Sequence, residues 1–278
     1  MKRTEHGLTD PNQQDKEIRH KMGSDVIFEK RGKTAYITLN RPKQKNAINL
    51  AVRQGLCDAW DEINRDTDIA SVILTGGENV FSTGQDLVEL AEFRKTEPTA
   101  ELPLNDHNTF GIHVEKPVIA AIGGYCLGAG FLLTMLCGDI RIAADTAKFG
   151  MPEVNVGVPP SFGIPPLLAK SFPYAIAVEI LLAGKNITAE AACQFGYVNK
   201  IVPAQDLMAA AEAYAARIND LSPLIVKNIK KVLRQAASPD PVAISFSDAI
   251  CALGRKSEDY IEGPKAFREK RKPVWKGR

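Results

Sequence analysis

The alternation of hydrophobic and polar residues predicts short strands near the start of the chain. Residues 26–28 and 35–39 are rich in β-branched and aromatic residues, and the polar pair Arg31-Gly32 lies between them. Two such runs joined by a short glycine-containing turn are typical of a β-hairpin. The sequence therefore predicts an antiparallel pair of strands here.

Beyond Asn49 the pattern changes to the period of a helix. The apolar residues that recur every three or four positions are Val52, Leu56, Trp60 and Ile63. This spacing places them on one face of a helix, and the side chain of Asn49 is suited to capping its first turn. The sequence predicts an amphipathic helix that buries this face.

The middle of the chain repeats one order of elements, in which a strand is followed by a glycine turn and a helix. The predicted strands are residues 71–75, 117–122 and 139–143. One predicted helix starts at Asp86, and another covers residues 129–137. The repetition indicates ββα-type units wound into a spiral, which is an α/β fold.

Composition divides the chain into three regions. Residues 1–24 are polar and lack the apolar core of a signal peptide, so we interpret them as a flexible N-terminal extension. Residues 25–203 hold the strands and glycine turns, with a polar, irregular surface segment at 92–108. Residues 204–278 form a C-terminal helical region. Its predicted helices are residues 204–235, 242–253 and 264–272.

Charge and cysteine usage exclude several classes of function. The formal net charge of +2 favours neither a nucleic-acid partner nor an acidic membrane surface. The five cysteines have no C-x-x-C or zinc spacing, so reduced thiols and no metal site are expected. No apolar run reaches the roughly 18 residues of a membrane span. The sequence thus predicts a cytoplasmic protein without a membrane segment.

Two glycine-containing turns precede predicted helices, at residues 81–86 and 124–130. Glycine permits a tight turn lined by bare amides, and a helix N-terminus leaves its first N–H groups unpaired and partly positive. Two such amides aimed at one point make an oxyanion hole. Either turn alone would be weak evidence, because glycine turns before helices are common.

Several stretches together make the sequence similar to the enoyl-CoA hydratase/isomerase (crotonase) superfamily. They occur in that family's order from about residue 25 to the C-terminus and are LNRPKQKNAIN at 39–49, FSTGQDL at 81–87, KPVIAAIGGYCLGAG at 116–130, DIRIAADTAKFGMPEV at 139–154, LLAGKNITAEAACQFGYVNKIVP from Leu181 and AFREKRKPVW near the end. The resemblance implies a crotonase-like spiral with a C-terminal helical region. It also implies an enzyme acting on an acyl-CoA thioester, without indicating the acyl group.

The resemblance implies catalytic roles for three residues. The backbone amides of Gln85 and Ala129 would hold the thioester carbonyl, and Glu153 in the FGMPE stretch would transfer the proton. Loss of one comparable donor costs about 3 kcal/mol of transition-state stabilisation. A carboxyl group beside apolar neighbours has its pKa raised towards neutrality, which suits a group that takes and returns a proton.

The sequence departs from the family pattern at the second carboxylate. Typical hydratases carry another glutamate shortly after the last glycine of the second turn, whereas here Leu132 or Leu133 takes that place. Ser161 also stands where a glycine is commoner. A leucine beside Glu153 excludes water, so hydration of a simple short enoyl-CoA is expected to be slow unless Ser161 or the substrate positions the water.

The resemblance also implies contacts to coenzyme A. The backbone around Lys45 and Ala47 would hold its adenine end, while Phe267 and Lys270 would reach the coenzyme of a neighbouring subunit. The full set expected to bind the acyl-CoA substrate is Lys45, Ala47, Thr83, Gln85, Asp86, Leu87, Ala129, Leu132, Leu133, Ser161, Phe267 and Lys270. Coenzyme A enters as part of the substrate, so no separate cofactor is expected. The implied assembly is a homotrimer or a dimer of trimers.

The single glutamate leaves three activities open. Hydration of an enoyl-CoA, or dehydration of a 3-hydroxyacyl-CoA, is preferred because hydration is the family's commonest activity. A Δ3,Δ2-enoyl-CoA isomerase needs only one glutamate to move a proton between carbons. A non-catalytic or RNA-binding protein on the same fold is the third hypothesis, and the near-neutral charge gives RNA no special support.

Overall fold

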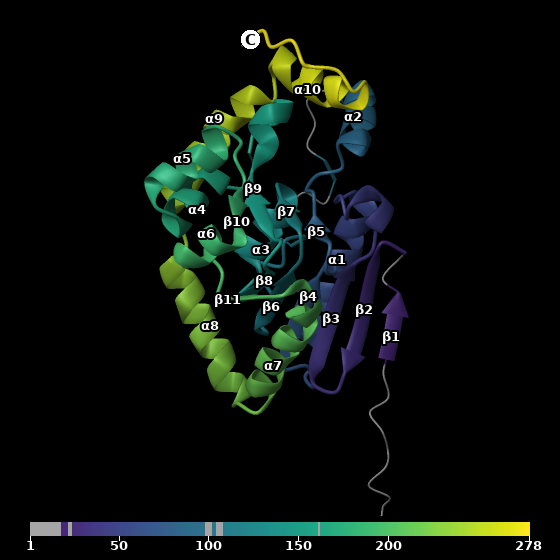
Figure 1. The fold of residues 1–278 in the computed structure, drawn as a ribbon, viewed down its shortest axis with the longest axis vertical. Helices are drawn as coiled ribbons and strands as arrows, with labels where there is room; N and C mark the ends of the chain where they lie inside the picture. Colours follow the sequence, from purple (N-terminus) through teal and green to yellow (C-terminus); the bar gives the residue numbers. More distant parts are fainter. Residues whose placement is uncertain (1–17, 22–23, 98–101, 104–107, 161) are drawn as a thin grey trace, which may run out of the picture.

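The computed structural model describes residues 18–21, 24–97, 102–103, 108–160 and 162–278, so most of the predicted N-terminal extension lies outside it. Two β-sheets form the centre of the molecule, with helices around them (Figure 1). The larger sheet has the order β1 (Ile18–Lys21), β2 (Val26–Arg31), β3 (Thr34–Leu39), β4 (Ser71–Thr75), β6 (Val118–Ile122), β8 (Ile140–Ala144) and β11 (Lys200–Val202). The smaller sheet has the order β10 (Ile187–Thr188), β9 (Lys148–Gly150), β7 (Tyr125–Leu127) and β5 (Val80–Ser82).

Successive segments of the chain contribute one strand to each sheet. β4, β6 and β8 run parallel in the larger sheet, and β5, β7 and β9, which follow them in sequence, run parallel in the smaller one. Helix α2 (Leu87–Thr96) follows β5, and α3 (Ala129–Leu136) follows β7. This order confirms the predicted α/β spiral of ββα units. Because β5 and β7 are neighbours, the two glycine turns after them come side by side.

The hairpin and the first long helix form as predicted. β2 pairs with β3 in the antiparallel sense, with Val26 opposite Leu39. Helix α1 (Leu50–Arg65) starts after Asn49, whose Oδ1 accepts a hydrogen bond from the Val52 amide at 2.9 Å. The apolar face of α1 packs into the main core. A cap satisfies an amide that the helix itself leaves unpaired, so this local signal located the helix start correctly.

The second half of the chain is mostly helical. Its elements are η2 (Pro152–Val156), α4 (Ile164–Ser171), α5 (Tyr174–Leu182), α6 (Ala189–Gln194), η3 (Ala204–Asp206), α7 (Leu207–Asn219), α8 (Pro223–Ala237), α9 (Pro241–Gly254) and α10 (Glu258–Arg268). Helix α10 packs against α2 at one end of the molecule, and α8 lies along an outer edge (Figure 1). Among the described residues, no helix combines the length and apolar character needed to cross a membrane. The division of the chain at residue 204 stays a prediction.

The segment predicted to be irregular is helical in its first part, since α2 continues through residues 92–96. Glu92 and Lys95, one turn apart, form an ion pair at 2.6 Å, and Arg94 is buried. Long charged side chains cover apolar surface with their stems, so a polar composition is compatible with a packed helix. The prediction for residues 92–96 is therefore wrong.

The last helix starts earlier than predicted. The sequence pattern placed its start at Pro264, whereas α10 begins after Ser257, whose hydroxyl oxygen accepts a hydrogen bond from the Tyr260 amide at 3.2 Å. Acidic residues in its first turn complement the helix dipole. Pro264 lies inside the helix, so the predicted range 264–272 is wrong at both ends.

Candidate active site

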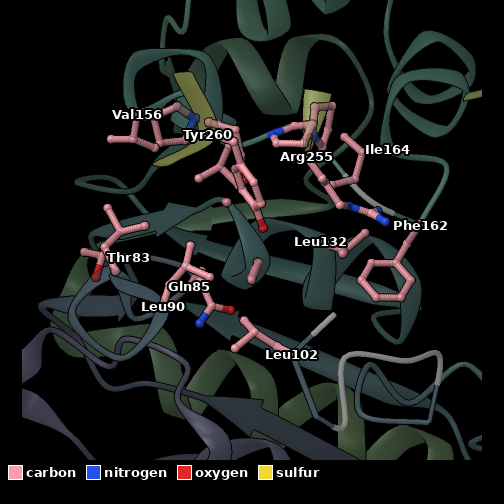
Figure 2. Close-up of a pocket in the computed structure, with 18 of the residues that line it drawn as sticks. Thr83, Gln85, Leu90, Leu102, Leu132, Val156, Phe162, Ile164, Arg255 and Tyr260 are labelled. Carbon is pink, nitrogen blue, oxygen red and sulfur yellow. The ribbon is translucent and has the colours of Figure 1, made fainter. Parts of the chain in front are cut away.

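A cavity of about 120 Å³ lies where the turns after β5 and β7 meet η2 and α10 (Figure 2). Its polar lining residues are Thr83, Gln85, Arg94, Glu153, Arg255 and Tyr260. Its apolar lining includes Leu87, Leu90, Leu102, Phe110, Leu132, Val156, Phe162 and Ile164. A concave apolar pocket with a few convergent polar groups is the expected form of a small-molecule site.

The two glycine turns meet at this pocket. Gly84 has a φ of +92°, and a Cβ atom on it would lie 2.8 Å from the Leu127 carbonyl oxygen and 3.1 Å from the Ala129 amide nitrogen. Gly128 has a φ of +53°, and a Cβ atom there would lie 2.9 Å from Oε1 of Glu153. Glycine is thus required at both positions for the backbone conformation and for the close approach of the two turns to each other and to the carboxyl group.

The backbone amides of Gln85 and Ala129 are free to bind a ligand. The next amide along the chain, that of Asp86, is used, because it donates to the Ile48 carbonyl at 3.0 Å. Across the described part of the chain, the amides of Gln85 and Ala129 donate to no backbone or side-chain acceptor. Ala129 is also the first residue of α3, where unpaired N–H groups carry partial positive charge. Two such donors suit an oxygen that becomes negative during a reaction.

Glu153 lies in η2 with its carboxyl group facing Gly128. Burial raises the pKa of this carboxyl group from 4.5 to about 7, against a smaller lowering by a backbone hydrogen bond. Its Oε2 atom is shielded from solvent and has no hydrogen-bond partner among the described residues. A buried polar atom without a partner is costly, so a water or ligand at this place would stabilise the site. The carboxyl group is suited to accept and return a proton near neutral pH.

The structure distinguishes the two leucines that follow the second turn. Leu132 lines the pocket, whereas Leu133 is buried in the core away from it. Successive helix residues point about 100° apart, so only one of the two faces the ligand. Among the described lining residues, Glu153 is the only carboxylate. Ser161, the other position at which the sequence departs from the family pattern, lies outside the described residues.

Thr83 and Leu87 line the pocket, whereas Asp86 supports it from outside. The Asp86 carboxylate accepts hydrogen bonds at 3.1 Å from two amides in the first turn of α2 and pairs with Arg41 at 2.9 Å. These bonds fix the start of α2 and therefore the turn that carries the Gln85 amide. Direct contact of Asp86 with the substrate stays a prediction.

The residues expected to hold coenzyme A lie in two places. Lys45 and Ala47 belong to the loop beside the first glycine turn, and the Lys45 carbonyl accepts a hydrogen bond from the Thr83 amide at 3.1 Å. Phe267 and Lys270 are exposed at the far end of α10 and just beyond it. Neither of them lines the pocket of its own chain.

Sequence reasoning missed the polar lining residues of α2 and the C-terminal region. Arg94 lies in the segment expected to be irregular, and Arg255 and Tyr260 precede the helix that was expected to be the last. The cap at Ser257 is the signal that could have placed Tyr260 on a helix. No local pattern in the sequence could have predicted that this helix packs beside the pocket.

Comparison with known proteins agrees with this geometry. The enoyl-CoA hydratase/isomerase family model matches residues 29–278. The chain is 36% identical over 252 residues to a short-chain-enoyl-CoA hydratase of Clostridium acetobutylicum, covering 90% of this chain and 96% of that protein. It is 37% identical over 271 residues to a carnitinyl-CoA dehydratase of Citrobacter koseri, covering 92% and 100%.

Comparison with solved structures identifies the same family. The crystal structure of carnitinyl-CoA hydratase from Mycobacterium avium matches with a TM-score of 0.78 at 33% sequence identity, covering 92% of this chain and 100% of that one. The expected resemblance is confirmed in sequence and in structure. The chain belongs to the enoyl-CoA hydratase/isomerase (crotonase) family.

Proposed function

We propose that the protein adds water to an enoyl-CoA, or removes water from a 3-hydroxyacyl-CoA, through a thioester enolate. The observation that carries this proposal is that the turns bearing the free amides of Gln85 and Ala129 meet the buried carboxyl group of Glu153 at one pocket. The two sequence relatives described above are named a hydratase and a dehydratase, which supports this chemistry over isomerisation. Coenzyme A comes with the substrate, so the proposal needs no separate cofactor.

In the proposed reaction the thioester carbonyl accepts hydrogen bonds from the two amides. Ionised Glu153 takes a proton from water as the water oxygen bonds to C3, and the electrons of the double bond move into the thioester to form the enolate. The amides stabilise the new charge on the carbonyl oxygen. Glu153 then returns the proton to C2, and dehydration follows the same steps in reverse.

Isomerisation of a 3-enoyl-CoA is the second candidate. The observation in its favour is Leu132, which lines the pocket where a second carboxylate would hold water in typical hydratases. Moving a proton from C2 to C4 needs one base and a dienolate whose oxygen the same two amides can hold, and no water. The two reactions therefore differ in whether an oxygen atom is added to the substrate. The same pocket surface could bind the acyl group in both.

A panel of thioesters tests the proposal. Crotonyl-CoA, 3-butenoyl-CoA and an aromatic enoyl-CoA would be incubated with the protein, and product masses followed. Gain of one water by at least one enoyl-CoA supports it, and Leu132 makes crotonyl-CoA the slower of the hydrated substrates. If 3-butenoyl-CoA is converted to a product of the same mass and no thioester of the panel gains water, isomerisation would replace hydration as the proposed reaction.

The rate of hydration should depend on the ionisation of Glu153. Burial raises the pKa of its carboxyl group to about 7, and only the ionised form takes the proton from water. We therefore expect kcat/KM to increase with pH through neutrality and to level off above the pKa. A kcat/KM that stays constant from about pH 5 to about pH 9 would contradict this role.

We also propose that the chain assembles as a homotrimer or a dimer of trimers. Helices α8 and α9 expose the large apolar side chains Leu224, Ile225, Ile229, Val232, Leu233, Val242, Phe246, Ile250 and Leu253. Exposed apolar area of this extent is typical of a surface that binds another protein. Light scattering should give a multiple of three chain masses. An active monomer would contradict both the assembly and the proposed contact of Phe267 and Lys270 with the coenzyme A bound to a neighbouring subunit. The cytoplasmic location expected from the sequence stays a prediction.

A further inference from the structure

Tyr260 reaches the pocket from α10, the helix that packs against η2, where Glu153 lies. Gly263 is on the same face of α10 one turn later, and a Cβ atom there would lie 1.8 Å from the Val156 carbonyl oxygen. The two elements are therefore in backbone contact beside the site. This contact explains why Tyr260 and Glu153, far apart in sequence, line one cavity.

The hydroxyl group of Tyr260 is a buried hydrogen-bond donor directed into this cavity. The residue is 5% exposed, and Figure 2 shows its hydroxyl pointing into the pocket. The hydroxyl oxygen accepts a hydrogen bond from Nη2 of Arg94 at 2.5 Å, and the guanidinium carbon lies 4.7 Å from the ring centroid. The phenol proton has no acceptor among the described residues. A donor whose oxygen already accepts from a cation is strengthened towards an acceptor that becomes negative.

Other neutral polar side chains of the pocket are already engaged. The Thr83 hydroxyl donates to the Lys45 carbonyl at 3.3 Å. The Gln85 side chain accepts from Arg53 and donates to the Asp86 carbonyl. Apart from the second amide proton of Gln85, the phenol proton of Tyr260 is therefore the neutral side-chain donor that remains for a ligand among these three residues.

We infer that the Tyr260 hydroxyl holds the oxygen that attacks or leaves C3, in the role that a second carboxylate would otherwise have. The inference rests on the proposed hydration. During hydration Glu153 takes one proton from the water, the water oxygen bonds to C3, and Tyr260 donates a hydrogen bond to a remaining lone pair of that oxygen. Tyr260 keeps its proton throughout, and Glu153 returns the transferred proton to C2. In dehydration the same hydrogen bond stabilises the departing hydroxyl as the C3–O bond breaks.

The test is Tyr260→Phe, which keeps the ring beside Arg94 and removes only the hydroxyl. We expect kcat for hydration to fall about 10²-fold with KM changed by less than about 3-fold. Tyr174→Phe is the matched control, because Tyr174 is 77% exposed and lies outside the pocket. Binding of butyryl-CoA, a saturated thioester that cannot be hydrated, should be the same in wild type and Tyr260→Phe and shows that the site has folded.

A second measurement asks whether Tyr260 stands in for a carboxylate. In a Leu132→Glu background, where the pocket gains a carboxylate, Tyr260→Phe should lower kcat by less than about 3-fold. In a Leu133→Glu background, where the added carboxylate points into the core, Tyr260→Phe should still lower kcat by about 10²-fold.

Three results would overturn the inference. One is a Tyr260→Phe protein as active as Tyr174→Phe. Another is retained kcat with weakened butyryl-CoA binding, which would make Tyr260 a contact to the acyl group. The third is a wild type that hydrates no enoyl-CoA, which refutes the proposed function and the inference with it. The first two leave wild-type hydration intact, so the failures are distinguishable.

Discussion

Turnover should fall by about 10²-fold or more when Glu153 is replaced by glutamine. Glutamine keeps the shape of the side chain but cannot take a proton from water or return one to C2. Binding should survive, because the amides of Gln85 and Ala129 and the apolar walls of the pocket are unchanged. Steady-state kinetics on the best substrate of the panel, with butyryl-CoA binding as the control, measure the two effects separately.

The same variant should also be the more stable protein in mild alkali. The folded-state pKa of Glu153 is raised from 4.5 to about 7, so ionisation of this group lowers folding stability as pH rises between those values. Glutamine does not ionise, and the free energy of unfolding of Glu153→Gln should exceed that of the wild type above about pH 7. Denaturant unfolding at pH 8 and pH 4 checks the sign. If Glu153→Gln is less stable than the wild type at pH 8 but not at pH 4, the ionised carboxylate stabilises the folded protein, and this prediction is contradicted.

Replacing Gly84 by alanine should disrupt the oxyanion hole and lower kcat/KM by about 10²-fold, the effect expected for loss of one donor. The new Cβ atom would lie 3.1 Å from the Ala129 amide nitrogen and 2.8 Å from the Leu127 carbonyl oxygen. Because both neighbours are backbone atoms, the two turns must move apart. The amides of Gln85 and Ala129 would then no longer converge on one oxygen.

Gly77→Ala is the matched control for this prediction. Gly77 has a φ of +98°, close to the +92° of Gly84, so alanine suffers similar backbone strain at both positions. A Cβ atom on Gly77 meets nothing within 4 Å. Both variants should lose stability in thermal unfolding from this strain, Gly84→Ala the more because of its backbone clash, and only Gly84→Ala should lose activity. Equal loss of kcat/KM in the two variants would mean that strain, and not the position of the amides, accounts for the effect.

The features that the sequence predicted correctly depend on local rules. Asn49 and Asp86 cap the helices that follow them because a short polar side chain before an apolar period satisfies unpaired amides. The turns at Gly84 and Gly128 require positive φ, which favours glycine and so leaves a mark in the sequence. The roles of Gln85, Ala129 and Glu153 came from the family resemblance, and their catalytic assignment stays a proposal.

The features that could not be predicted depend on contacts between distant segments. Arg94 and Tyr260 are 166 residues apart, and only the packing of α10 on α2 and η2 brings them to the pocket. Leu132 and Leu133 are both apolar residues of one short helix, so composition could not decide which of them faces the ligand. Residues 92–96 are helical although their composition is polar, and Arg94 among them is buried in contacts with residues distant in sequence, such as Tyr260.

The central claim is that this pocket adds water to C3 of an enoyl-CoA, and isotopic labelling of the product tests it most directly. An enoyl-CoA turned over in water enriched in oxygen-18 should give a 3-hydroxyacyl-CoA with one heavy oxygen on C3, at a rate that Glu153→Gln reduces by about 10²-fold. A product that contains no solvent oxygen, formed from a 3-enoyl-CoA by a shift of its double bond, would contradict the account.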